Sequence, residues 1–157
     1  MKRILIAVDE SPAAAEAVAF GVELATTDGV DVVFAHVVPA SDGSPGPALR
    51  TASRHHHEMS VSDRSSLDAA LLYAAKRGVA AESKILVGDD VDEIVAYADS
   101  LDVDLIVVGA RGESAVTTPL LGSVSRGVLG EARRPVLVVH RVLAGVPRTL
   151  VGDAHAS

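Results

Sequence analysis

A set of glycine and serine residues in the C-terminal half has a spacing that could hold phosphate. Gly109, Gly112 and the pair Gly122-Ser123 form the pattern G-x2-G-x9-G-S. Glycine lets backbone N–H groups approach a ligand without an intervening Cβ atom. The pair Gly122-Ser123 stands where a helix is expected to begin, and the free N–H groups and dipole of a helix start favour an anion. We therefore expect a phosphate chain to bind between a strand end and a helix start.

Neighbouring residues would complete such a site. Arg111 adds a cation between the first two glycines, and Ser123 and Ser125, on either side of Val124, add hydroxyl groups. Asp9 follows the first apolar run of the chain. An aspartate in that position can contact a ligand or can act only as a helix cap or turn residue. Its expected place beside the phosphate pattern favours ligand contact.

Other reactive residues have simpler interpretations. His36 is expected to be partly buried in a strand. The run His55-His56-His57 is a poor metal site, because neighbouring side chains diverge by about 100° on a helix and alternate faces on a strand. In the acidic segment that follows the third apolar run, Asp90 and Glu93 have the spacing of a capping box at a helix start. We predict no metal site made of protein side chains.

Five short apolar runs alternate with helical patterns and must position these residues. Most of the runs are nearly continuous β-branched and aliphatic residues, which is typical of strands covered on both faces. The expected strands are Ile4–Val8, Val32–Val38, Glu82–Val87, Leu105–Val108 and Val136–Val139. We predict an α/β fold: a doubly wound, five-stranded parallel sheet with helices on both faces and strand order 3-2-1-4-5. Ligands of such sheets bind at the carboxyl ends of the strands, where the strand order reverses.

Helix signals fill the intervals between the strands. A serine followed by proline is an N-cap with proline in the first turn, and a glycine after an apolar stripe is a helix end. The expected helices begin at Ser11-Pro12, span about Ser65–Arg77 before Gly78, begin near Asp90, and run from Ser123 or Ser125 to about Ala132. Pro39 to Ser62 has no periodicity and is rich in proline, glycine and serine, so we expect a long loop. This loop either responds to ligand binding or is a tolerated surface insertion.

Composition limits the function classes. The 157 residues fit one domain over 1–141 and a C-terminal tail over 142–157. A net charge of −7 and an aromatic fraction of 3% argue against nucleic acid as a partner. The chain has no cysteine, which excludes disulfides and thiolate catalysis. No apolar run approaches the length of a membrane span or a signal peptide, so we expect a cytoplasmic protein.

The chain resembles the universal stress protein family from Arg3 to Arg141. The matching segments are Ile4–Ser11, Ala35–Val37, Asp104–Gly112, Gly122–Ser125 and Pro135–Val139. The ATP-binding branch of that family carries the same glycine and serine pattern. The resemblance implies that Asp9 lies at the nucleoside, that Val37 meets adenine through its backbone and that Ala7, where family members often have proline, lines the pocket. The implied ATP-binding residues are Ala7, Asp9, Val37, Gly109, Arg111, Gly112, Gly122, Ser123, Val124 and Ser125. It also implies a homodimer through the last strand, Val136–Val139.

Several catalytic signatures are missing. The chain has no phosphate-loop lysine motif, and Glu113 is the carboxylate nearest in sequence to the expected phosphates. A response-regulator receiver would need a lysine after the last strand, where the chain has His140-Arg141. We expect an ATP-binding regulator of stress survival that turns ATP over slowly or not at all, with Mg²⁺ carried by the phosphates. The alternatives are a slow ATP hydrolase or nucleotidyl-transferring enzyme of the same fold, and a nucleotide-free dimeric interaction module.

Overall fold

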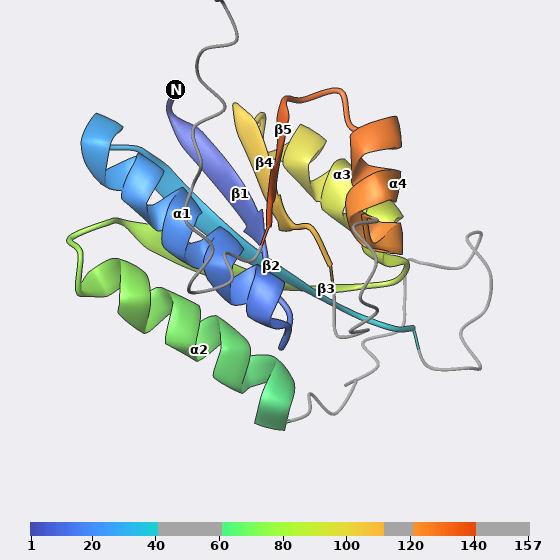
Figure 1. The fold of residues 1–157 in the computed structure, drawn as a ribbon, viewed down its shortest axis with the longest axis horizontal. Coiled ribbons are helices and arrows are strands. Elements are labelled where there is room, and N and C mark those ends of the chain that lie inside the picture. The colour runs from blue at the N-terminus through green and yellow to red at the C-terminus, as the bar shows by residue number, and fades with distance from the viewer. Residues whose placement is uncertain (41–60, 112–120, 141–157) are drawn as a thin grey trace, which may run out of the picture.

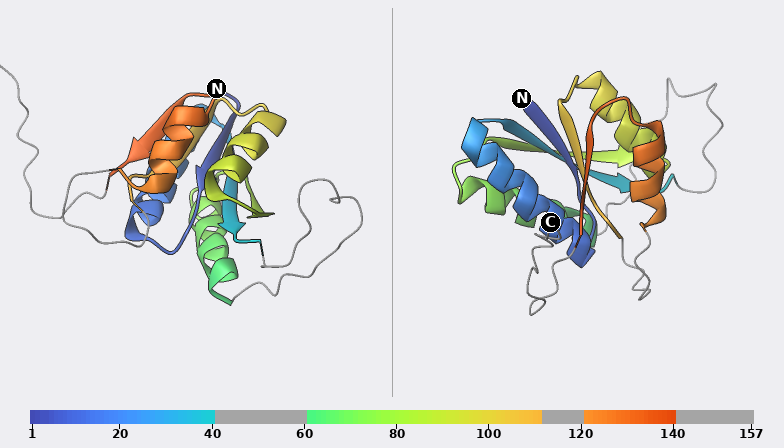
Figure 2. Two further views of the ribbon diagram at one scale, coloured as in Figure 1. Left: turned by 90° about the vertical axis from the view of Figure 1, so that its right-hand side faces the viewer. Right: turned by 45° about the horizontal axis from the view of Figure 1, so that its top comes forward.

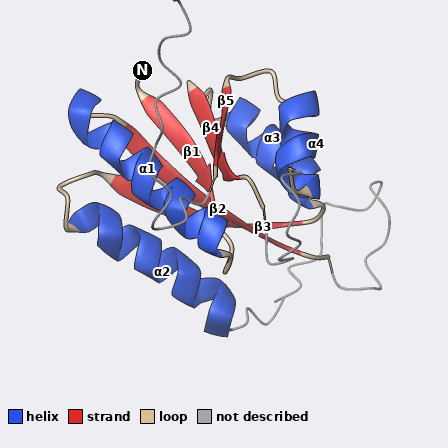
Figure 3. Cartoon of the chain, in the orientation of Figure 1, coloured by secondary structure: helices blue, strands red, loops and turns tan. Residues whose placement is uncertain are grey.

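The computed structural model describes residues 1–40, 61–111 and 121–140. Strands and helices alternate along the described chain (Figure 3). The strands are β1 (Arg3–Ala7), β2 (Asp31–Val38), β3 (Ala81–Val87), β4 (Leu105–Gly109) and β5 (Val136–Val139). The helices are α1 (Pro12–Asp28), α2 (Val61–Ala75), α3 (Asp90–Ser100) and α4 (Ser123–Glu131). The α/β fold class is therefore confirmed.

The strands form one parallel sheet in the order β3-β2-β1-β4-β5 (Figure 1). Ile4 of β1 pairs with Val32 of β2 on one side and with Leu105 of β4 on the other. The strand order that was predicted, 3-2-1-4-5, is the observed one. From β1 the chain adds β2 and β3 on one side of the sheet and then β4 and β5 on the other, so the strand order reverses between β1 and β4. The ligand-binding edge expected for this fold therefore lies at the carboxyl ends of these two strands.

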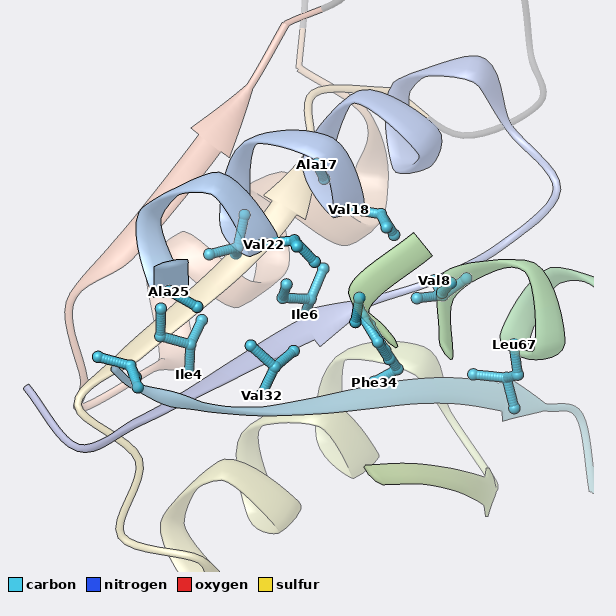
Figure 4. Packing of buried hydrophobic residues seen from close by; sticks show 14 residues of the cluster. Ile4, Ile6, Val8, Ala17, Val18, Val22, Ala25, Val32, Phe34 and Leu67 are labelled. Carbon is cyan, nitrogen blue, oxygen red and sulfur yellow. The ribbon is translucent and has the colours of Figure 1, made fainter. Parts of the chain in front are cut away.

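Two helices cover each face of the sheet (Figures 1 and 2). On one face, α1 and α2 pack on a cluster that includes Ile4, Ile6 and the fully buried Phe34 (Figure 4). On the other face, α3 and α4 pack on a second cluster that includes Leu5, Ile106 and Val128. Alternate residues of β1 thus enter opposite cores, which explains why its sequence is apolar throughout.

Local signals set most of the helix ends. The Ser11 side chain caps α1 and accepts a hydrogen bond from the Ala14 N–H at 3.1 Å. Gly29 ends that helix with a φ of 64°, a left-handed conformation that favours glycine. At α3 the N-cap is Asp89, whose Oδ1 accepts from the N–H groups of Val91 and Asp92. The capping-box start at Asp90 was therefore placed one residue too late.

Several sequence predictions fall on residues outside the described ranges. They include Gly112, Glu113, the run His55-His56-His57, most of the loop expected over Pro39–Ser62, and the tail over 142–157. Among the described helices, none has both the length and the apolar composition needed to cross a membrane. Within the same ranges, no group of histidine and acidic side chains is arranged to hold a metal ion.

Candidate functional site

The carboxyl ends of β1 and β4 lie side by side, and the segments that follow them are joined by hydrogen bonds. After β1, Asp9 Oδ1 accepts from the Ser11 N–H at 2.8 Å, which closes a tight turn. After β4, the Arg111 carbonyl accepts from the Ser11 hydroxyl at 3.3 Å. Asp9 and Arg111, which lie far apart in sequence, are thus brought to one edge of the sheet. Asp9 is exposed there and is a turn residue, while Ser11 is the helix cap.

Gly109 is the residue that allows this approach. A Cβ atom on Gly109 would lie 2.6 Å from the Ala13 carbonyl carbon and 2.9 Å from the Ala14 nitrogen. Real Cβ atoms do not come so close to backbone, so the end of β4 and the first turn of α1 can touch only through a glycine. We interpreted Gly109 as a residue that exposes backbone to phosphate. In the structure, the side of Gly109 on which another residue would carry its Cβ atom faces the start of α1.

The start of α4 is anchored to the end of β4. The Gly122 N–H donates to the Ala110 carbonyl at 2.7 Å, and the Ala110 N–H donates to Val139 of β5 at 2.8 Å. The Ser125 hydroxyl is buried and lies 3.0 Å from the Ala110 carbonyl and 3.1 Å from that of Gly122. Ser125 therefore fastens the turn and uses its hydroxyl hydrogen inside the protein.

The first turn of α4 has no side-chain cap among the described residues. Gly122 is the N-cap residue and provides no side-chain cap, and Ser123 is exposed at the first helical position. The first intrahelical bond is donated by the Arg126 N–H to the Gly122 carbonyl, so the N–H groups of Ser123 and Val124 precede the helical ladder. These are the groups that a helix start presents to an anion.

The base-binding residue expected from sequence, Val37, lies where the β1–β2 ladder has ended. The last register pair is Ala7 with Ala35, and the Val8 N–H donates to the Ala35 carbonyl at 2.8 Å. Alternate residues of a parallel strand direct their backbone groups to the same neighbour. Val37, two residues after Ala35, therefore directs its N–H and C=O toward the β1 side, beyond the last register pair of the two strands.

Comparison with known proteins identifies the family. A model of the universal stress protein family matches residues 1–140. The chain belongs to the universal stress protein family.

Relatives of this universal stress protein support the assignment. A universal stress protein of Methanocaldococcus jannaschii is 30% identical over 140 residues, which cover 89% of this chain and 82% of that protein. The universal stress protein of Archaeoglobus fulgidus, solved in complex with dAMP, has a TM-score of 0.66 and 26% identity over 88% of this chain and 98% of its own. A universal stress protein solved in complex with cAMP has a TM-score of 0.64 and 26% identity over 88% of this chain and 96% of its own.

Two features of the sheet edge were missed by the sequence analysis of this universal stress protein. Asp90, at the first position of α3, was interpreted only as part of a helix start. Partial desolvation, reinforced by the carboxylates of Asp89 and Asp9, raises the pKa of Asp90, and nearby His36 acts in the opposite direction. Asp90 therefore belongs to the electrostatic surroundings of the candidate site. The signal that could have revealed it is its place immediately after β3, on the edge where β1 and β4 also end.

The second missed feature is the environment of His36. It was expected to be partly buried, and only 8% of the residue is exposed. Its Nδ1 lies 2.7 Å from the Val8 carbonyl oxygen, and its Nε2 lies 3.0 Å from Oδ1 of Asp63 in α2. His36 thus links the end of β1 to the first turn of α2. No local pattern in the sequence pairs these three residues, because the contacts depend on the order of the strands.

Proposed function

We propose that this universal stress protein binds an adenine nucleotide, ATP in particular, at the carboxyl ends of β1 and β4. The observation that carries the proposal is the first turn of α4, which no described side chain caps and which is anchored at the end of β4, beside the switch in strand order. Phosphates would accept from the N–H groups of Ser123 and Val124. The relatives solved with dAMP and cAMP support an adenine nucleotide as the ligand class.

The nucleoside would lie between the end of β1 and Val37. The Val37 N–H and C=O face that space as a donor and acceptor pair, which is what the Watson–Crick edge of adenine requires. Asp9 and Ala7 border the same space, and Arg111 would offset phosphate charge. Mg²⁺ would be carried mainly by phosphate oxygens, because Mg²⁺ retains most of its water and binds few protein groups.

We further infer a regulatory role in stress survival, in the cytoplasm, with slow or no hydrolysis of ATP. The carboxylate closest along the chain to the proposed nucleoside site, Asp9, already accepts a hydrogen bond within its own turn. Because Asp9 would border the nucleoside and not the phosphates, it is poorly placed to activate a water molecule for hydrolysis. Two copies of the chain would pair through β5.

The test uses Gly122→Val and Gly112→Val. Gly122 has a φ of −62° and a ψ of 163°, an extended conformation that valine also adopts, so Gly122→Val should fold. Its side chain would occupy the helix start where phosphate is expected, and we expect ATP binding to be lost in titration calorimetry. Gly130→Ala is the matched control, because a Cβ atom at Gly130 meets open space on the same helix.

The outcomes separate the candidates. ATP affinity that is lost in Gly122→Val and kept in Gly130→Ala supports the proposed site. Unchanged ATP affinity in both Gly122→Val and Gly112→Val, with the fold intact, contradicts it. Mass spectrometry of nucleotide that co-purifies with the wild-type protein identifies the adenine nucleotide that is preferred.

A further inference from the structure

His36 has acceptors at both ring nitrogens. The Val8 carbonyl, 2.7 Å from Nδ1, can only accept a hydrogen bond, so Nδ1 carries the hydrogen in this contact. The ionised carboxylate of Asp63, 3.0 Å from Nε2, is also an acceptor. The imidazolium form of His36 satisfies both contacts at once. If the ring is neutral, the contact with Val8 still requires the hydrogen on Nδ1.

The contact at Nδ1 changes which backbone groups pair at the end of β1. Since the Val8 N–H donates to the Ala35 carbonyl, a continued parallel ladder would have the Val37 N–H donate to the Val8 carbonyl. Between these two described residues, the structure instead has the His36 ring on that carbonyl. The ladder stops one bond early, and the Val37 N–H is left facing the candidate nucleoside site.

We propose that His36 is a positioning residue for base recognition: by occupying the Val8 carbonyl, its Nδ1–H keeps the Val37 N–H available to a ring nitrogen of adenine. The proposal rests on the proposed function, because it assigns the base-recognising part of the same nucleotide site. Asp63 fixes the ring from α2 through Nε2. Without the Nδ1 donor, the Val37 N–H could turn to the Val8 carbonyl and close the ladder.

The charges around His36 are consistent with this role. Asp63 faces the ring from α2, and Asp90 acts on it from the start of α3. Asp9 and Asp89 lie near Asp90 on the same edge. Acidic side chains from two helices, Asp63 of α2 and Asp90 of α3, thus lie near the ring that holds the Val8 carbonyl.

Two neutral substitutions separate the contacts of the ring. In His36→Asn, the side-chain amide nitrogen stands near the position of Nδ1 and can still donate to the Val8 carbonyl. In His36→Gln, the amide nitrogen reaches toward Asp63 instead, in the place of Nε2. Binding is measured with AMP and with ribose 5-phosphate, which lacks the base. Thermal unfolding of each variant reports any general loss of stability.

We expect His36→Gln to raise the Kd for AMP about tenfold, the loss of roughly one hydrogen bond, and His36→Asn to raise it less than about threefold. The Kd for ribose 5-phosphate should change in neither variant. Equal effects of the two variants on AMP, or parallel changes in both ligands, would overturn the positioning role. Wild-type protein that binds ribose 5-phosphate as tightly as AMP also overturns it. Wild-type protein that binds neither AMP nor ATP overturns the proposed function itself.

The ring can also be observed directly. Nitrogen NMR of ¹⁵N-histidine-labelled protein distinguishes the two tautomers, and the His36 signals are those that disappear in His36→Asn. When the pH is raised until the ring is neutral, we expect the hydrogen to remain on Nδ1, opposite to the tautomer that free histidine favours. A neutral ring that retains the hydrogen on Nε2 contradicts the assignment.

Discussion

At the scale of single residues, Gly109 has a structural role that its place in the glycine and serine pattern concealed. We predict that Gly109→Ala lowers the free energy of unfolding by about 1–3 kcal/mol, as overpacking does in other cores. The reason is that a Cβ atom there would stand 2.6 Å and 2.8 Å from the carbonyl carbon and oxygen of Ala13, which cannot yield as a flexible side chain would. Urea unfolding measures the change.

The control for Gly109→Ala is Gly130→Ala in α4. A Cβ atom at Gly130 meets open space, and alanine favours a helix over glycine by up to about 1 kcal/mol, so this variant should be more stable than wild type. If Gly109→Ala is as stable as wild type, the close approach of α1 to β4 is not as tight as the structure has it. The role of Gly109 at a phosphate stays a prediction, and the geometry shows a separate structural reason for a glycine at this position.

At the scale of elements, Asp104 ties the start of β4 to the start of β1. Its carboxylate accepts from the backbone N–H groups of Lys2 and Arg3, and these two hydrogen bonds lower the pKa of Asp104. A carboxyl group with a lowered folded-state pKa stabilises the protein above its unfolded-state pKa. That stabilisation is lost as the pH falls through the folded-state value.

We therefore predict that Asp104→Asn is less stable than wild type at neutral pH and that the difference shrinks in acid. Unfolding is measured by denaturant between pH 7 and pH 3. Glu82→Gln, which removes an exposed carboxylate from β3, controls for the change in net charge. A stability difference that stays constant over this pH range would show that the charge of Asp104 does not hold the two strand ends together.

The positions of the strands and helices also show how much of this fold the sequence predicts. The apolar runs locate all of the described strands. For β1, β2 and β4 the reason is that strands buried on both faces need such runs, whereas β3 is largely exposed and its sequence alternates. Helix α2 begins at Val61, four residues before the expected start at Ser65. Its first turn has no apolar stripe from which the sequence could predict this earlier start. In the candidate site, the glycine and serine pattern is visible in local spacing, and its role in binding phosphate stays a prediction. The pairing of His36 with Val8 and Asp63 could not, because it depends on strand order and on packing between distant segments.

At the scale of the whole molecule, β5 is the last strand of the sheet, and among the described residues its ladder pairs it with β4 alone. The Ile106 N–H donates to the Pro135 carbonyl, and the Ala110 N–H donates to the Val139 carbonyl. Odd-numbered residues of β5 therefore face β4, and the backbone groups of Val136 and Val138 face outward. An outward, apolar edge invites pairing with another strand, and a second copy of the chain can offer the same edge.

We predict that wild-type protein is a homodimer paired through β5 and that Val138→Pro is a monomer. Proline removes the outward N–H of Val138 and leaves the bonds to β4, so the variant should still fold. Val138→Lys should act in the same direction by placing charge on the apolar edge. Ser83→Pro is the matched control, because the ladder of β3 likewise directs the N–H of Ser83 away from β2, at the opposite edge of the sheet. Sedimentation of all four proteins at micromolar concentration decides the matter: a monomeric wild type, or a Val138→Pro variant that remains dimeric, excludes pairing along β5.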